Sequence, residues 1–294
     1  MHLIYNSTGD ITGAIFYDYN PSQTAAWTLV VLFAVATVIH FIMMIPLRTW
    51  CFIVFILGGI CEAFGYYGRV MSHDNVRKMG PYMMQNLLIL VAPVLLAATV
   101  YMVLGRIIKG LNADDYSSIR TSRLTKIFVM SDVLAFVTQL AGSGVQATGD
   151  DQVIKIGNGV VLGGLIFQLV MFGIFLNVAA KFHKRLANEP IGLIKADPSI
   201  KWQRYFVGLY IAWVAVFVRN LVRVIEYAQG ENGSIVTNEA MLYIFDGAMM
   251  FITMAIFIIL HPGLLIRQAK RSTYNRMGAD TEAFFTVPPP EKNY

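Results

Sequence analysis

The chain has few charged residues and almost no cysteine. Only 14% of its 294 residues are Asp, Glu, Lys or Arg, whereas an ordinary soluble domain carries about a quarter. Its two cysteines, Cys51 and Cys61, would be about 15 Å apart on a shared helix, which is too far for a disulfide bond. The low cysteine count excludes a disulfide-stabilised scaffold, and the small charged fraction excludes the composition of a disordered chain.

Several patterns that carry catalysis or cofactor binding are also missing from the sequence. No G-x-x-x-x-G-K-[ST] loop is present to hold a nucleotide. Only His40 and His261 lie in or beside apolar segments, which is too few for a zinc hydrolase of the membrane. We therefore expect no catalytic residues, no metal site and no cofactor, and a protein that is not an enzyme. No basic groove domain is present either, so we expect no nucleic-acid partner.

The apolar residues, which make up 56% of the chain, are gathered into seven blocks of bilayer length. A membrane span needs about 20 apolar residues, and the mean hydropathy of +0.57 agrees with several such spans. Because lipid offers no partner for a backbone amide, each block is predicted to be a helix. The blocks are Ala25–Ile45, Cys51–Gly68, Leu87–Ile107, Ile127–Gly144, Gly159–Ala180, Tyr205–Tyr227 and Ala240–Leu260. The sequence thus predicts an all-α polytopic membrane protein, with an N-terminal segment at 1–24, a seven-helix transmembrane domain at 25–263 and a tail at 264–294.

The basic residues are distributed unevenly between the two sides of this predicted bundle. With the N-terminus outside the cell, 17 of the 23 Lys and Arg lie in cytoplasmic segments and four lie in outer segments. Because cytoplasmic loops are enriched in Lys and Arg, the sequence predicts an extracellular N-terminus and a cytoplasmic C-terminus. The same orientation places two glycosylation sequons, at Asn6 and Asn232, on the outside. We expect a glycoprotein that is integral to the plasma membrane.

Ionisable and amide side chains interrupt the apolar blocks of the second, fourth, fifth, sixth and seventh predicted helices. They are Glu62, Arg69, Asp132, Gln139, Gln168, Arg219, Arg223, Glu226 and Asp246. A charge at the centre of a membrane helix costs about 2.5–3.5 kcal/mol on insertion scales, so such groups normally face the bundle interior and pair. Spacings of three, four and seven residues place these groups on single faces of the second, fourth and sixth helices. Three helices are therefore predicted to carry inward polar stripes.

In the predicted orientation, most of these side chains lie in the outer half of the bundle, and Asp132 lies deeper. We therefore expect a polar chamber beneath the extracellular face, with Asp132 at or below its floor. One interpretation is a substrate-binding site; the other is a buried ion-pair network that only sets the register of the helices. Four carboxylates face three guanidiniums, and an unmatched buried acid either takes a proton or receives a cation. A ligand amine would match it.

Strings along the whole predicted bundle carry a resemblance to one family. They are Tyr17-Asp18-Tyr19-Asn20-Pro21-Ser22, Glu62-x-x-Gly65-Tyr66-x-x-Arg69, Ala92-Pro93, Leu104-Gly105-Arg106, Asp132 with Gln139, Gly164 with Gln168, Arg219-x-x-x-Arg223-x-x-Glu226-Tyr227, Glu239 with Tyr243 and Asp246, and His261-Pro262-Gly263. In this order, over roughly residues 17–263, the chain resembles the fungal RTA-like family of lipid-translocating exporters. At residue 220 that family often has a small side chain, whereas this chain has Asn220.

The resemblance implies a seven-helix fold and a transport function. Members of the family are linked to export of sphingoid long-chain bases, resistance to amphipathic amines such as aminosterols, and porphyrin uptake. The resemblance therefore implies efflux or translocation of an amphipathic lipid or amine, with roles in drug resistance and stress response, and with membrane lipids and that substrate as partners. The alternative is a seven-helix receptor or stress sensor that binds an amphipath without moving it. The familiar G-protein-coupling strings Asp-Arg-Tyr and Asn-Pro-x-x-Tyr are absent from the ends of the third and seventh helices.

Overall fold

The computed structural model describes the backbone at residues 2–5, 11–15, 20–74, 76–117, 121–146, 151–230, 233 and 238–286. Side chains are described in the same ranges except at 2–15, 121–122, 143–146, 151–154, 196 and 276–286. The predicted glycosylation residues Asn6 and Asn232 lie outside the described residues.

Seven helical segments in these ranges are long and apolar enough to cross a bilayer, which confirms the predicted all-α, seven-helix fold. Six of them are α1 Gln23–Leu47, α2 Phe52–Asp74, α3 Met79–Gly110, α4 Thr121–Gln146, α5 Asp151–Asn188 and α7 Trp202–Gln229. The seventh runs from Glu239 to Asn275 and includes the start of α10 Pro262–Thr286. Its first part, α8 Glu239–Met241, η2 Leu242–Ala248 and α9 Met249–Ile259, is named here the seventh segment. The orientation of the termini across the membrane stays a prediction.

Short elements flank the spans. A two-stranded antiparallel hairpin, β1 His2–Tyr5 and β2 Ile11–Ile15, precedes the bundle. A 3-10 turn, η1 Asp114–Tyr116, follows α3, and a short helix, α6 Gly192–Ala196, joins α5 to α7. The hairpin adds a small β element to the N-terminal segment and leaves the bundle helical.

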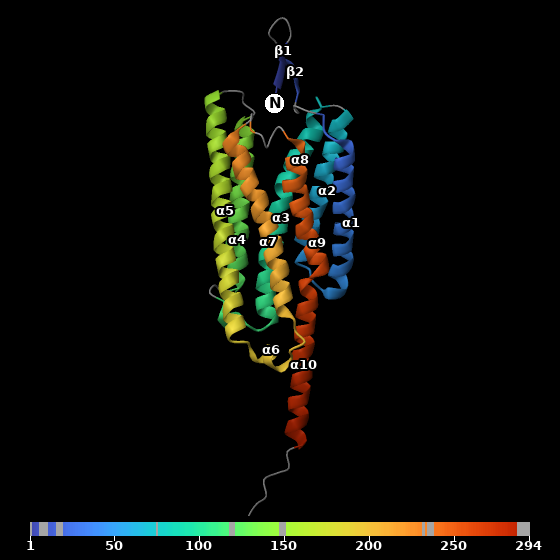
Figure 1. Cartoon of the computed structure of the whole chain (residues 1–294), viewed down its shortest axis with the longest axis vertical. Helices are drawn as coiled ribbons and strands as arrows, with labels where there is room; N and C mark the ends of the chain where they lie inside the picture. Colours follow the sequence, from blue (N-terminus) through green and yellow to red (C-terminus); the bar gives the residue numbers. More distant parts are fainter. Residues whose placement is uncertain are drawn as a thin grey trace, which may run out of the picture.

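The helices form a bundle in which α3, α7 and the seventh segment lie between two helical hairpins (Figure 1). One hairpin is α1–α2 and the other is α4–α5. The β-hairpin lies at one end of the bundle, and α10 projects beyond the opposite end (Figure 1). An odd number of spans requires this separation of the two termini.

Apolar side chains cover the bundle as well as filling it. Phe52, Phe55 and Phe257 are fully buried, in edge-to-face contact with one another. Ile42 and Met130, by contrast, are more than 60% exposed on the outer faces of their helices. A helix that is apolar on all sides is typical of a membrane span, because its outer face contacts lipid.

The seventh segment departs from a regular α-helix in two places. Residues Leu242–Ala248 form a π-helix, which widens the turn by one residue. Further along, α9 ends at Ile259 and α10 begins at Pro262, whose missing N–H has no consequence in a first helical turn. The first irregularity determines where Asp246 lies.

Candidate functional site

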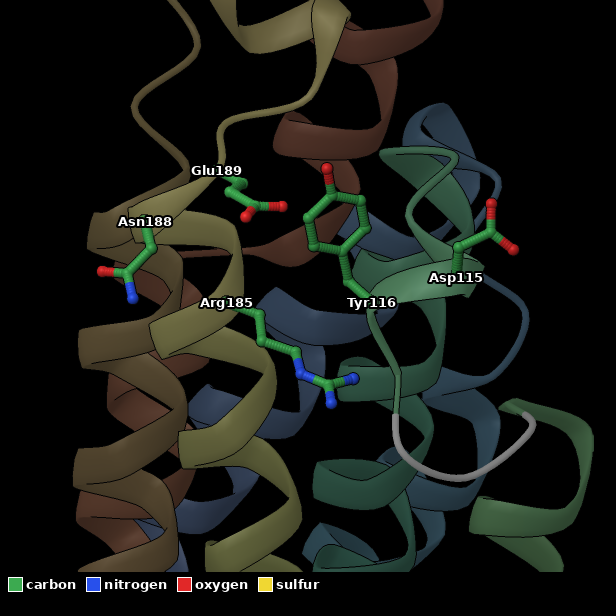
Figure 2. Close-up of a pocket in the computed structure, with 5 residues that line it drawn as sticks. All are labelled: Asp115, Tyr116, Arg185, Asn188 and Glu189. Atoms are coloured by element: carbon green, nitrogen blue, oxygen red, sulfur yellow. The ribbon is translucent and has the colours of Figure 1, made fainter.

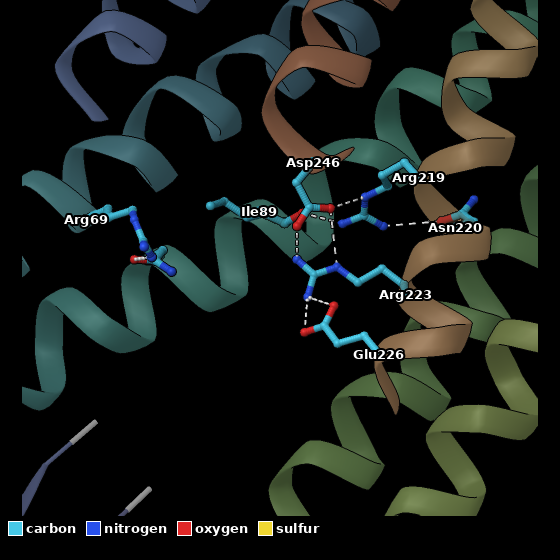
Figure 3. Close-up of polar contacts among 8 residues, drawn as sticks. Arg69, Ile89, Arg219, Asn220, Arg223, Glu226 and Asp246 are labelled. Carbon is cyan, nitrogen blue, oxygen red and sulfur yellow. Dashed lines mark hydrogen bonds and ion pairs between the residues drawn. The ribbon is translucent and has the colours of Figure 1, made fainter. Parts of the chain in front are cut away.

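Two arginines of α7 meet an aspartate of the seventh segment inside the bundle (Figure 3). Arg219 Nε lies 2.9 Å from Asp246 Oδ1, and Arg223 Nε donates to the same oxygen at 3.2 Å. Arg223 Nη2 pairs with Asp246 Oδ2. Asp246 therefore partly neutralises the positive charges of both guanidiniums and connects α7 to the seventh segment.

The sequence of α7 explains why the two arginines lie together. Arg219 and Arg223 are four residues apart, so both side chains point from one face of the helix. The position of their partner comes from η2, because Asp246 lies within the π-helical turn. Such turns are frequent at functional sites, since the extra residue redirects the side chains that follow it.

A proline in α3 supplies a further contact to Arg219. Pro93 has no N–H, so the carbonyl of Ile89, four residues earlier, has no donor within the helix. Arg219 Nη2 donates to that oxygen at 3.2 Å. Arg219 Nη1 donates to the side-chain oxygen of Asn220 at 3.2 Å, so the residue that distinguishes this chain at position 220 contributes an acceptor.

Glu226 extends the ion pairs toward the edge of the bundle. Arg223 Nη1 donates to both of its carboxylate oxygens, at 3.1 and 3.0 Å. The side chains of Arg223 and Glu226 are 19% and 23% exposed, whereas those of Arg219 and Asp246 are 3% and 7% exposed. The four residues, named here the Arg–Asp cluster, therefore run from a buried pair to a partly open one.

Glu62 on α2 lies beside this cluster and is completely buried. Neither of its carboxylate oxygens has a hydrogen-bond partner among the described residues. The charges that act on it are those of Arg219, Asp246 and Arg223. One turn along α2, the buried hydroxyl of Tyr66 also lacks a partner within the described ranges. Buried polar atoms are almost always satisfied, so an unsatisfied pair of this kind indicates a site for a missing ligand, ion or water.

The formal charges of the Arg–Asp cluster cancel without Glu62. Arg219 and Arg223 supply two positive charges, and Asp246 and Glu226 supply two negative ones. An ionised Glu62 would therefore leave one negative charge uncompensated in the bundle interior. Such a charge is costly unless it is paired.

A second polar group closes the end of the bundle nearest the β-hairpin, and we name it the terminal clasp. Arg69 Nη2 lies 2.8 Å from Glu239 Oε1, and Arg69 Nε donates to the hydroxyl of Tyr243 at 3.0 Å. The backbone of Ser22 donates to Glu239 at 2.8 Å and accepts from Tyr243 at 3.2 Å. The clasp thus ties the start of α1 to α2 and the seventh segment, and Figure 3 shows Arg69 apart from the Arg–Asp cluster.

A third polar group, the amide cluster, joins α4 to α5. Gln168 donates to Asp132 at 3.4 Å, and Gln139 donates to Gln168 at 3.4 Å. The hydroxyl of Tyr101 on α3 interacts with the Asp132 carboxylate. All four side chains are at least 95% buried in the interior between α3, α4 and α5. Asp132 Oδ1 accepts from Gln168, whereas Asp132 Oδ2 and the Tyr101 hydroxyl have no hydrogen-bond partner among the described residues.

Comparison with known proteins identifies the family. Residues 55–269 match the family described as RTA1 like protein. The chain belongs to the RTA1-like family. Protoporphyrin uptake protein 1 of Saccharomyces cerevisiae is 31% identical over 286 residues, which cover 85% of this chain and 93% of that protein. No solved structure matches the chain.

Two further relatives from Saccharomyces cerevisiae are named RTA1 and RSB1. Protein RTA1 is 31% identical over 211 residues, covering 72% of this chain and 65% of that protein. Sphingoid long-chain base transporter RSB1 is 26% identical over 272 residues, covering 82% of this chain and 71% of that protein. Family membership and the seven apolar helices together make this chain an integral membrane protein.

A pocket of about 300 Å³ opens at the end of this RTA1-like bundle that lies away from the β-hairpin (Figure 2). Its lining residues are Asp115 and Tyr116 from η1, Arg185 and Asn188 from α5, and Glu189. Asp115, Arg185 and Glu189 are exposed to solvent and carry charges of both signs. The pocket is therefore a solvated surface feature, separate from the three polar groups of the interior.

The structure groups the nine sequence-predicted site residues in three places. It brings Glu62, Arg219, Arg223, Glu226 and Asp246 together, of which helical spacing predicts only the shared face of Arg219, Arg223 and Glu226. It places Asp132, Gln139 and Gln168 in the amide cluster and Arg69 in the terminal clasp, where a single shared chamber was expected. Binding of substrate by any of these residues stays a prediction.

Glu239 and Tyr66 belong to the strings that carry the family resemblance, but they are not among the site residues predicted from the sequence; Glu239 pairs with Arg69, and Tyr66 lies beside Glu62. Glu239 lies at the head of the seventh segment, where an acid is expected to interact with the helix N-terminus. Tyr66 follows Glu62 by four residues, so helical spacing was the signal that could have found it. Within the described ranges, no group of three His, Cys, Asp or Glu side chains is placed to hold a metal ion.

Proposed function

We propose that this RTA1-like protein moves an amphipathic lipid or amine across the membrane, with the headgroup held at Glu62 and the Arg–Asp cluster. The observation that carries the proposal is Glu62, a fully buried carboxylate without a partner among the described residues, next to four charges that already cancel. A cationic headgroup would pair with Glu62, while its tail stays among the apolar side chains or in lipid.

The same cluster suits an anionic headgroup as well. Arg219 and Arg223 present guanidinium donors, which bind carboxylate and phosphate oxygens through paired hydrogen bonds. The names of two relatives, a sphingoid long-chain base transporter and a protoporphyrin uptake protein, support a site that accepts either charge. A long-chain base carries an amine, and protoporphyrin carries carboxylates.

The other predicted substrate-binding residues keep separate proposed roles. Arg69 in the terminal clasp would contact a headgroup that enters or leaves at the β-hairpin end. Asp132, Gln139 and Gln168 would contact it elsewhere along the path. We further propose that the N-terminus is extracellular, and that the protein acts in the plasma membrane, where export protects a cell from toxic amphipaths.

Liposomes containing the purified protein test this function. A fluorescent long-chain base is placed in the inner leaflet, and its arrival in the outer leaflet is followed by chemical quenching. We expect the wild type to accelerate this movement. Glu62→Gln should slow it about tenfold or more, because a hydrogen bond to a charged group contributes about 1.5–3 kcal/mol.

Glu189→Gln is the matched control, since it makes the same chemical change at an exposed carboxylate far from Glu62. Its transport rate should equal that of the wild type. Tight binding of the long-chain base without any movement would instead favour the receptor or sensor, and neither binding nor movement would refute the proposed function.

A further inference from the structure

We propose that Glu62 exchanges a proton for the cationic headgroup, so that each monovalent amphipath moves one way as one proton moves the other way. This inference rests on the proposed function and deepens it by naming how transport is driven. It follows from the burial of Glu62 and from the charges around it.

The charges in the site permit only two low-energy states. With the Arg–Asp cluster balanced, a protonated Glu62 leaves the site neutral, and an ionised Glu62 paired with a cation also leaves it neutral. The third state, an ionised Glu62 with no cation, is a buried carboxylate without a hydrogen bond among the described residues. Burial without pairing strongly disfavours such an ion.

Exclusion of the third state is what couples the two movements. A transporter that changes its open side only in the neutral states must carry either the proton or the cation each time. In the exchange step, the O–H bond of the Glu62 carboxyl breaks and the proton passes to water on the open side. The carboxylate then forms an ion pair with the ammonium group. The step runs in reverse on the other side, and no net charge crosses the membrane.

The helices that surround Glu62 supply no other acid that could take this role. Arg219 and Arg223 face it from α7, and Asp246 faces it from η2. The helix α1 carries no Asp, Glu, Lys or Arg, and those of α3, Arg106 and Lys109, lie at its far end. Asp246 is already paired with both arginines and Glu226 with Arg223, so Glu62 is the acid left to exchange its proton.

Hydroxyl groups lead from Glu62 toward the terminal clasp. The Tyr66 hydroxyl lies one turn along α2 and lacks a partner within the described ranges. The Tyr66 ring stacks on Tyr243 with 6.2 Å between ring centroids, and the Tyr243 hydroxyl contacts Arg69 and Ser22. No hydrogen bond joins the Tyr66 hydroxyl to Glu62 or to Tyr243 among the described residues, so proton passage along this side would need bridging water.

Proton release on binding tests the exchange directly. Purified protein in weakly buffered detergent is titrated with a quaternary ammonium amphipath, whose charge is fixed, while a pH dye reports protons. We expect about one proton released for each ligand bound by the wild type and by Glu189→Gln. Glu62→Gln should release none and should bind at least tenfold more weakly, and Glu62→Asp should restore release with a shifted midpoint pH.

Because the charge of the probe is fixed, liposomes can also show whether a pH gradient or a membrane potential drives its movement. The probe is loaded inside, and either an acidic outside or a membrane potential is imposed. We expect the pH gradient to drive exit, with a difference of one pH unit supporting about a tenfold concentration ratio. A potential imposed at equal pH should change nothing, because the exchange is electroneutral.

The outcomes distinguish this inference from the function on which it rests. Binding and movement of the probe without proton release, or exit that follows the potential, would overturn the exchange and leave transport standing. Release of a proton by folded Glu62→Gln would assign the proton to another group and overturn the role of Glu62. A wild type that neither binds nor moves the probe would refute both for cationic substrates.

Discussion

Asp246 is the residue on which the interior ion pairs depend. It forms an ion pair with Arg219 and accepts hydrogen bonds from Arg223, and its own side chain is 7% exposed. Removing one member of a buried ion pair costs about 3–5 kcal/mol, because the other charge is left in a medium that cannot solvate it. The pair between Arg223 and Glu226 lies nearer the surface, where water compensates for a lost partner.

Two double-mutant cycles compare these pairs at the residue scale. We expect Arg219→Ala and Asp246→Ala each to lower the unfolding temperature strongly, and the double variant to lose much less than the sum of the two. The coupling energy should be about 1–3 kcal/mol for this pair and less than about 1 kcal/mol for Arg223→Ala with Glu226→Ala. Thermal unfolding in detergent measures both, and equal couplings would contradict the ranking by burial.

Two elements owe their role to a break in regular helical geometry. Pro93 leaves the carbonyl of Ile89 free for Arg219, and the π-helix η2 positions Asp246. Both breaks lie where helices approach closely. A side-chain carbon added at Gly247, inside η2, would collide with Leu29 Cδ1 and would lie 2.9 Å from the Tyr66 hydroxyl, closer than such atoms tolerate.

A pair of glycine substitutions tests this packing at the element scale. Gly247→Ala should lower the unfolding temperature and transport together, because the new methyl group displaces Leu29 and also Tyr66, which lies beside Glu62. Gly173→Ala in α5 is the control, since no atom lies within 4 Å of its added carbon. There we expect a stability gain of about 0.5–1 kcal/mol from the better helix former. Equal effects of the two substitutions would show that the space around η2 is not constrained.

At the scale of the whole molecule, the polar groups divide the bundle along its length and across it. The terminal clasp closes the β-hairpin end, the Arg–Asp cluster with Glu62 lies among α2, α3, α7 and the seventh segment, and the amide cluster lies between α3, α4 and α5. The long helix α10 leaves the other end (Figure 1). Uneven placement of Lys and Arg predicts that α10 is cytoplasmic.

The predicted orientation has its own test. Tyr274 on α10 is 79% exposed, so Tyr274→Cys should react with a thiol reagent only after cells are made permeable. An enzyme that removes N-linked glycans should reduce the mass of the wild type. The same treatment should reduce the mass of Asn6→Gln by a smaller amount, because that variant lacks one glycosylation site. Labelling of Tyr274→Cys on intact cells would contradict the predicted orientation and place α10 outside the cell.

The amino-acid sequence by itself determined the number of spans, since hydropathy and bilayer thickness leave seven helices as the only reading of seven apolar blocks. It also determined that Arg219, Arg223 and Glu226 share a face, because that depends only on helical spacing. Which acid those arginines meet was decided by the tertiary structure. The π-helical turn at Asp246 and the carbonyl freed at Ile89 depend on contacts between helices, which spacing along one helix cannot specify. The same is true of Glu62, whose lack of a partner is a property of the assembled bundle, because only packing shows which buried charges have been neutralised by others.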